Sequence, residues 1–222
     1  MYLTRLFLNP VHRDVHKCME DSHALHVRVL SLFGDSEQGR ANLGVLHRLE
    51  VNEQTGTVVL LVQSATAPRR DALPAGFLDP RAAADAWSST PLEPFFDRLT
   101  TGAAFRFRLR ANATRRIDTK TGPDGKRRNG RRVPLRRDDV LRAWIVRKLA
   151  DAGLEPAGEV RIRPDGAPRG NRAGKRVTHE AHVFEGVAIV RDGARARDAV
   201  QRGVGPAKAY GCGLLSLAPS PH

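Results

Sequence analysis

The segment AAFRFRLRANATRR, residues 103–116, limits the possible folds more than any other part of the sequence. Its apolar and basic side chains alternate, with Phe105, Phe107 and Leu109 between Arg106, Arg108 and Arg110. Successive side chains of a strand point to opposite faces. The segment therefore predicts a strand with one buried face and three guanidinium groups on the other.

The remaining elements follow an order that repeats once along the chain. In the first half, the pattern predicts a strand at 2–8, a helix at 21–33, strands at 45–51 and 57–65, an Ala-rich piece at 81–87, and the alternating strand. In the second half, it predicts a strand at 131–135, a helix at 136–154, strands at 158–164 and 175–190, a helix from 198, and a strand at 213–219. We therefore predict an α+β protein of two tandem ferredoxin-like (RRM-like) domains, residues 1–115 and 116–222.

The charge of the chain points to a polyanionic partner. Lys and Arg number 37 against 24 Asp and Glu, which gives a formal net charge of +13. Aromatic residues make up only 5% of the chain, and the stacking signature of RNA-binding RRM proteins is missing. We therefore expect recognition of RNA through phosphates, shape and a groove rather than through stacked bases.

Two further features of the sequence bear on where in the cell the protein is found. No run of 18 apolar residues occurs, so we expect no membrane span. Cys18 and Cys212 lie far apart in different contexts, which is typical of reduced thiols in a cytoplasmic protein.

A very basic hairpin is expected between the strands at 158–164 and 175–190. Its size would let it enter a groove of a folded RNA, whereas the alternative is a solvated tip without a role. The residues assigned to RNA binding in it are Arg161, Arg163, Arg169, Arg172, Lys175 and Arg176.

The segment RGVGPAKAYGCGLLSLAP, residues 202–219, is rich in glycine. Glycine lets backbone N–H groups approach a phosphate closely. The spacing fits neither a P-loop nor a dinucleotide-binding motif, since Lys208 interrupts both patterns. We assign Gly203, Gly205 and Lys208 to contact with an RNA backbone. The alternative is that the glycines serve only close packing of a helix against a strand.

Two histidines could perform chemistry. His23 and His26 are three residues apart on the predicted helix at 21–33, so both project from one side near its N-terminus. RNA cleavage without a metal needs one group to take the proton from a 2′-OH and another to protonate the departing 5′-oxygen. Two imidazoles can supply both roles, and the products would be a 2′,3′-cyclic phosphate and a 5′-OH.

The histidines also have other interpretations. His12 and His16 could bind zinc together with Cys18 or His23, although no second cysteine pair or acidic partner stands nearby. Ordinary surface or core histidines are the simpler alternative. Clustered carboxylates for a magnesium-dependent nuclease are missing from the sequence. No role is assigned to the other strand histidines, His47, His179 and His182.

Five segments taken together resemble the CasE family of CRISPR-associated endoribonucleases. They are MYLTRLFLNP, HALH in the first helix, FRFRLRANATRR, the basic hairpin before HVFEG, and GVGPAKAYGCGLLSLAP. The resemblance covers the whole chain. It implies two ferredoxin-like domains and a catalytic histidine on the first helix, which His26 matches. Many family members carry a tyrosine three residues earlier, where this sequence has His23.

The resemblance also implies a function. Proteins of this family cut CRISPR repeat RNA at the 3′ side of its hairpin without a metal, and they retain the product as a subunit of the Cascade surveillance complex. We expect no cofactor, a monomer when free, and the repeat hairpin and other Cascade subunits as partners. The alternative is a non-catalytic subunit that binds an RNA hairpin in a ribonucleoprotein.

Overall fold

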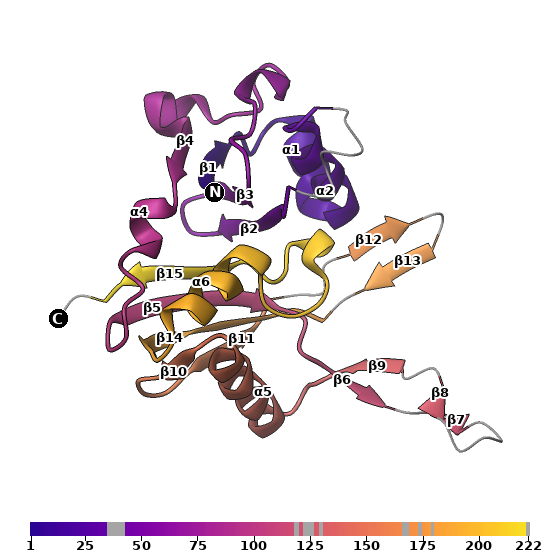
Figure 1. Ribbon diagram of the computed structural model, residues 1–222. Coiled ribbons are helices and arrows are strands. Elements are labelled where there is room, and N and C mark those ends of the chain that lie inside the picture. The colour runs from indigo at the N-terminus through magenta and orange to yellow at the C-terminus, as the bar shows by residue number, and fades with distance from the viewer. Residues whose placement is uncertain are drawn as a thin grey trace.

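The computed structural model describes residues 1–34, 43–117, 120–121, 127–128, 131–165, 169–172, 175–178 and 180–220. Figure 1 shows two units, one above the other, and a narrow arm that projects from the lower one.

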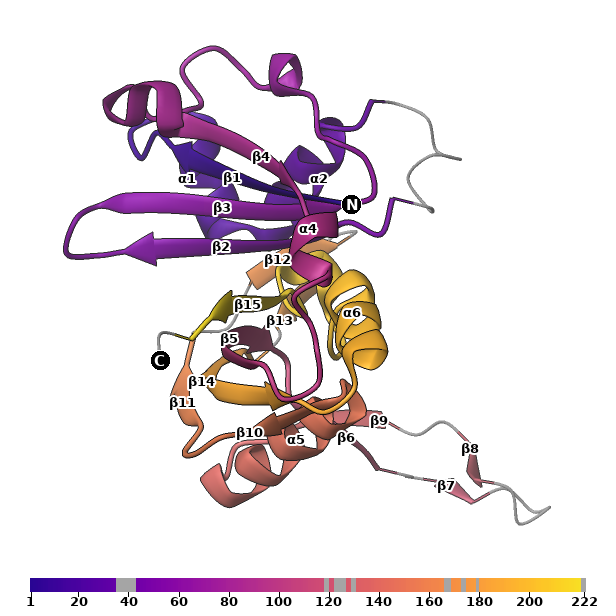
Figure 2. The same ribbon diagram turned by 60° about the vertical axis from the view of Figure 1, so that its left-hand side comes forward.

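The first unit is a four-stranded antiparallel sheet in the order β2-β3-β1-β4. The strands are β1 (Tyr2–Leu8), β2 (Leu46–Asn52), β3 (Thr57–Ser64) and β4 (Trp87–Pro91). Helices α1 (Arg13–Glu20) and α2 (Ser22–Ser31) cover one face of it (Figure 2). The core between sheet and helices includes Leu6, Leu8, Val15, Leu25, Val29, Val58, Leu60 and Val62.

The start of α2 is as the sequence predicts. The Asp21 side chain accepts a hydrogen bond from the His23 backbone N–H at 2.8 Å, which satisfies one unpaired donor of the first turn. Helix α1 was not predicted. Its N-cap is His12, whose Nδ1 accepts from the Asp14 N–H, and histidine is not among the usual N-cap residues that mark a helix start.

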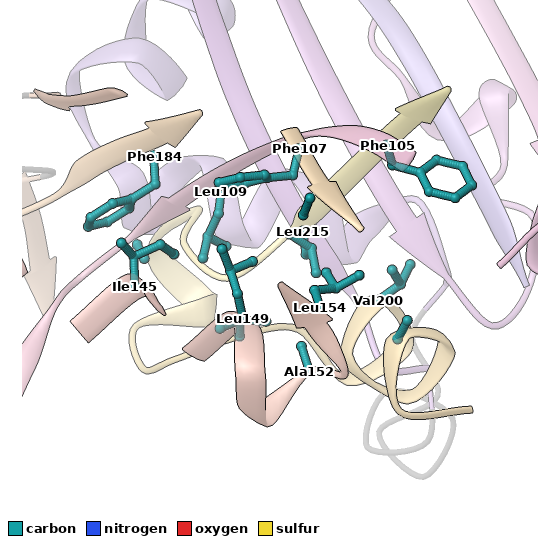
Figure 3. Close-up of a cluster of buried hydrophobic side chains, with 14 of the residues drawn as sticks. Phe105, Phe107, Leu109, Ile145, Leu149, Ala152, Leu154, Phe184, Val200 and Leu215 are labelled. Atoms are coloured by element: carbon teal, nitrogen blue, oxygen red, sulfur yellow. The ribbon is translucent and has the colours of Figure 1, made fainter. Parts of the chain in front are cut away.

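The second unit is also an antiparallel sheet, in the order β10-β14-β5-β15, with β11 pairing to β14 as well. Its strands are β5 (Ala104–Ala111), β10 (Leu154–Pro156), β11 (Arg161–Pro164), β14 (His182–Val190) and β15 (Leu215–Pro219). Helices α5 (Asp138–Asp151) and α6 (Gly193–Arg202) bury their apolar sides against it. Figure 3 shows Phe105, Phe107 and Leu109 of β5 in this core, so the predicted alternation is confirmed.

Both units have the same connectivity. In each, the first and third strands lie side by side in the middle, with the second and fourth strands outside them. In the first unit the second crossover contains the 3₁₀ segment η2 (Pro80–Ala86) in place of a long helix. The prediction of two tandem ferredoxin-like units in the α+β class is therefore confirmed.

The strand at 104–111 was assigned to the wrong sheet. We predicted it as the last strand of the first domain, but β5 pairs with β14 and β15 and is the first strand of the second unit. β4 closes the first sheet instead. A division by sheet membership thus falls between Pro91 and Ala104 rather than after residue 115. Alternation predicts a half-buried strand but does not identify its neighbours.

Two further predicted strands differ in their pairing. The strand expected at 131–135 is β9 (Arg131–Pro134), which pairs with β6 (Thr114–Ile117) at the base of the projecting arm. The arm continues through β7 (Lys120–Thr121) and β8 (Arg127–Arg128). The strand expected at 175–190 is divided into β13 (Lys175–Thr178) and β14, and β13 pairs with β12 (Arg169–Arg172).

Buried hydrogen bonds join the two units. Arg48 of β2 is only 3% exposed and donates to the Leu214 carbonyl at 3.1 Å. Gln63 of β3 donates to the Val200 carbonyl at 2.7 Å, at the end of α6. Short segments η1 (Arg70–Ala72), α4 (Glu93–Phe96) and η3 (Lys208–Tyr210) complete the described elements. None of the described helices has the length and apolar character to cross a membrane.

Candidate functional site

Three segments that are far apart in the sequence, α2, β12 and η3, lie close together in the structure. Residues of α2 come within 8 Å, measured between Cα atoms, of both η3 and β12, and η3 also approaches β2. Figure 1 shows α2, the β12–β13 hairpin and the loop before β15 on the same side of the molecule. The predicted histidines, basic hairpin and glycine-rich segment are therefore brought together.

His26 lies on α2, which borders this region. Its side chain is half-buried, and Nδ1 is buried without a hydrogen-bond partner among the described residues. Burial lowers the pKa of His26 below its usual 6.5, and the charge of His23 lowers this pKa further. The imidazole is therefore mostly neutral at neutral pH and can accept a proton through its other nitrogen, Nε2.

His23 lies differently from His26. It lines a pocket of about 420 Å³ between α1 and α2, together with Asp14, Lys17 and Arg28. The charge of His23 is the second cause, after burial, of the lowered pKa of His26. The spacing of three residues thus gives two neighbouring histidines in unlike surroundings.

In the described part of the chain, the side chains considered for a zinc site are not arranged as metal ligands. His12 uses Nδ1 in the cap of α1, and Cys18 is buried, with its thiol pKa raised by burial to about 11. Across the described ranges, no three His, Cys, Asp or Glu side chains gather as metal ligands would.

The predicted basic hairpin is present, and its paired strands extend farther toward the tip than expected. β11 pairs with β14 at its base, and β12 pairs with β13 farther out. The register shifts by one residue between the two sections, since Pro164 to Arg169 is five residues while Thr178 to His182 is four.

The six basic residues assigned to this hairpin divide between its sections. Arg161 and Arg163 belong to β11 at the base, and both are exposed. Arg163 lies 3.7 Å from Glu185 and 3.9 Å from Asp165, so its charge is partly balanced within the protein. The backbone positions in the outer section are Arg169, Arg172, Lys175 and Arg176.

The glycine-rich segment is built for close approach of the backbone. Gly203 ends α6 with φ +72°, and a Cβ on it would lie 2.8 Å from the Gly213 carbonyl oxygen and from Leu46. Gly205 has φ +83° and faces Trp144 at 3.6 Å. The Gly203 N–H donates to the Ala199 carbonyl at 2.9 Å. For Gly203 this geometry supports the packing alternative.

Lys208 lies on η3, next to α2. Its ammonium donates to the Arg202 carbonyl, one of the carbonyls that the end of α6 leaves unpaired. The side chain is only half-buried, so it remains within reach of solvent.

Two residues of this region were not predicted to have a role. His47 of β2 is 1% exposed, and its ring lies nearly parallel to that of His26, with ring centroids 6.0 Å apart. Arg110 of β5 forms an ion pair with Asp165, at the base of the hairpin, and donates to the Tyr210 and Gly211 carbonyls at 3.0 and 3.3 Å. Arg110 therefore joins the hairpin base to the loop that faces α2.

Comparison with known proteins places this arrangement in a family. The sequence profile of a family described as CRISPR associated protein matches residues 1–219. CRISPR-associated endoribonuclease Cse3 of Thermus thermophilus is 34% identical over 99% of this chain and 100% of its own length. The chain belongs to the CasE family of CRISPR-associated endoribonucleases.

One further relative and one solved structure extend this match. The CRISPR system Cascade subunit CasE of Escherichia coli is 41% identical over 55% of this chain and 61% of its own length. A structure of Cse3 bound to a 19 nt RNA superimposes with a TM-score of 0.80 at 32% identity, covering 99% of this chain and all of that one. The family resemblance inferred from the sequence is thus confirmed.

Proposed function

We propose that this protein cleaves CRISPR repeat RNA at the 3′ side of its hairpin without a metal, and that it keeps the product. The observation that carries the proposal is the half-buried imidazole of His26, with its lowered pKa, on helix α2, which contacts both β12 of the basic hairpin and η3, the segment that carries Lys208. The names of the two relatives, an endoribonuclease and a Cascade subunit, support the substrate class and the partners.

The proposed reaction is a transesterification within the RNA. His26 takes the proton of a 2′-OH, and the 2′-oxygen attacks the adjacent phosphorus as the bond to the 5′-oxygen breaks. His23 gives a proton to the departing 5′-oxygen. The products carry a 2′,3′-cyclic phosphate and a 5′-OH, and both protons are accounted for.

Cationic groups would stabilise the extra negative charge on the phosphorane. Lys208 is the assigned cation outside the hairpin, and it lies on η3, which contacts α2. Arg169, Arg172, Lys175 and Arg176 would hold the stem through its phosphates, which favours retention of the hairpin product.

The proposal also includes the cellular location of the protein and its assembly with partners. Cys18 and Cys212 are both buried and unpaired, as expected for a protein of the reducing cytoplasm. We propose that the free protein is a monomer and that it joins other Cascade subunits through the retained RNA.

The proposal is tested with purified protein and an end-labelled repeat hairpin in excess EDTA. We expect a single cut whose 5′ fragment ends in a 2′,3′-cyclic phosphate, identified by its sensitivity to acid and by mass. No cut in EDTA with restoration by magnesium would overturn the metal-free mechanism. Tight binding without any cut on several repeats would favour the non-catalytic RNA-binding subunit.

A further inference from the structure

His47 is a buried histidine without an assigned role. It lies on β2, is 1% exposed, and its ring is tilted by 26° from the ring of His26. Because it is enclosed, His47 cannot touch an RNA substrate. Any part it plays in the proposed reaction must act through its neighbour.

The two rings share an unusual feature. His26 Nδ1 and His47 Nε2 are both buried and both lack a hydrogen-bond partner among the residues described. A buried polar atom without a partner costs about 1–3 kcal/mol, so most such atoms in folded proteins are paired. The structure has no direct bond between these two nitrogens, but two adjacent imidazoles with one unpaired nitrogen each can satisfy one another through one bridging water.

The surroundings of His47 hold it in place and keep it neutral. Gly211 has φ +73°, and a Cβ at this position would lie 3.7 Å from the His47 ring and 3.3 Å from the Arg110 guanidinium. Burial lowers the pKa of His47 to about 3, and the nearby charges of His26 and Arg110 act in the same direction. A neutral imidazole carries one N–H and one lone pair, so it can accept a hydrogen bond.

We propose that His47 is a positioning residue for His26: its Nε2 accepts the hydrogen bond of the His26 Nδ1–H through one bridging water. The His26 Nε2 lone pair is then available for the 2′-OH. This inference rests on the proposed function. In the reaction, the 2′-OH proton moves to His26 Nε2, and the resulting imidazolium keeps its Nδ1–H toward His47. The arrangement places a neutral group behind the base, where a hydrolytic triad has a carboxylate.

The first test compares two substitutions at one position. In His47→Gln, the side-chain amide can still accept a hydrogen bond near the position of Nε2, whereas His47→Leu cannot. We expect His47→Leu to lower the single-turnover rate by at least about 10-fold, a part of the 10²–10⁴ that a general base supplies. His47→Gln should stay within a few-fold of the original protein, and both should bind the hairpin equally.

The matched control is His182→Gln, which removes a buried imidazole from β14 of the second sheet. It reports the effect of losing a buried histidine as such. Wild-type cleavage by His47→Leu, or equal losses in His47→Leu and His47→Gln, would overturn the positioning role.

The second test needs no enzymatic activity, and its readout is made on the unaltered protein. Nitrogen-15 NMR of histidine-labelled protein, with His26→Ala used for assignment, shows which nitrogen of His26 carries the proton. We expect the Nδ1–H tautomer at neutral pH. A His26 that carries its proton on Nε2 would overturn the inference. Failure of the proposed function would instead be seen as absence of cleavage by the unaltered protein.

Discussion

At the residue scale, the protonation state of His26 decides what the site can do. Burial and the neighbouring His23 both lower its pKa, so the neutral form that can act as a base is favoured above pH 6.5. The same residue retains solvent access, in contrast to His47. A histidine with these two properties is suited to general base catalysis at physiological pH.

This protonation state predicts the pH dependence of cleavage. Acid protonates His26 and removes the base, so kcat/KM should rise with pH through the pKa of His26 in the free protein. Because this pKa lies below 6.5, the midpoint of the rising limb should also lie below 6.5. Initial rates at RNA concentrations below KM, measured from pH 4.5 to 8, give the profile. A rising limb centred above pH 7 would contradict the assignment of His26 as the base.

The sequence predicts His23 and His26 because their spacing lies within one helix. It does not predict His47 or Arg110 as parts of the site. His47 is 21 residues from His26, and Arg110 donates to carbonyls about 100 residues away. In the sequence, Arg110 looks like Arg106 and Arg108, its neighbours in the alternation. Only its tertiary contacts distinguish it, namely the ion pair with Asp165 and the hydrogen bonds to the Tyr210 and Gly211 carbonyls.

At the element scale, the basic hairpin is the part of the site with the clearest sequence signal. A run of arginines between two strand patterns is local, so its existence could be predicted. The partner of β5 could not, because strand pairing depends on residues far along the chain. The short helix α1 was missed for a local reason, the absence of a usual N-cap residue before it.

The outer hairpin section should carry part of the salt dependence of RNA binding. Replacing Arg169 and Arg172 together by alanine should weaken hairpin binding and reduce the slope of log K against log salt, by roughly one unit for each phosphate that is no longer neutralised. The matched control is the pair Arg147→Ala and Arg191→Ala, two exposed arginines on α5 and after β14. Filter binding from 50 to 300 mM salt measures both pairs. An unchanged slope in the hairpin variant would remove this section from the interface.

At the scale of the whole molecule, the site depends on how the two units meet. α2 and β2 belong to the first unit, while the hairpin, Arg110 and η3 belong to the second. Arg48 and Gln63 bridge the units by buried hydrogen bonds, and Arg108 of β5 forms an ion pair with Glu50 of β2 at 3.1 Å. The candidate site thus forms only when the units are packed together.

Gly203 tests this packing. Alanine there would place a Cβ 2.8 Å from the Gly213 carbonyl oxygen and from Leu46 of the first unit, at φ +72° and ψ 159°, a backbone conformation that is essentially limited to glycine. Gly56→Ala is the matched control, because Gly56 has φ +64° and no atom within 4 Å of its Cβ position. We expect Gly56→Ala to cost about 1–2 kcal/mol of unfolding free energy. Gly203→Ala should cost about 1–3 kcal/mol more through overpacking. Urea denaturation measures the difference, and equal losses would show that Gly203 does not hold the units together.

The most direct test of the account is His26→Ala beside His16→Ala, an exposed histidine on α1, with cleavage and hairpin binding measured on the same preparations. We predict that His26→Ala abolishes cleavage and leaves binding within a few-fold, since one imidazole adds little to a phosphate-dominated interface. His16→Ala should retain both. Cleavage by His26→Ala at the unaltered rate, or a loss of binding in proportion to the loss of cleavage, would contradict the role of His26 as the base.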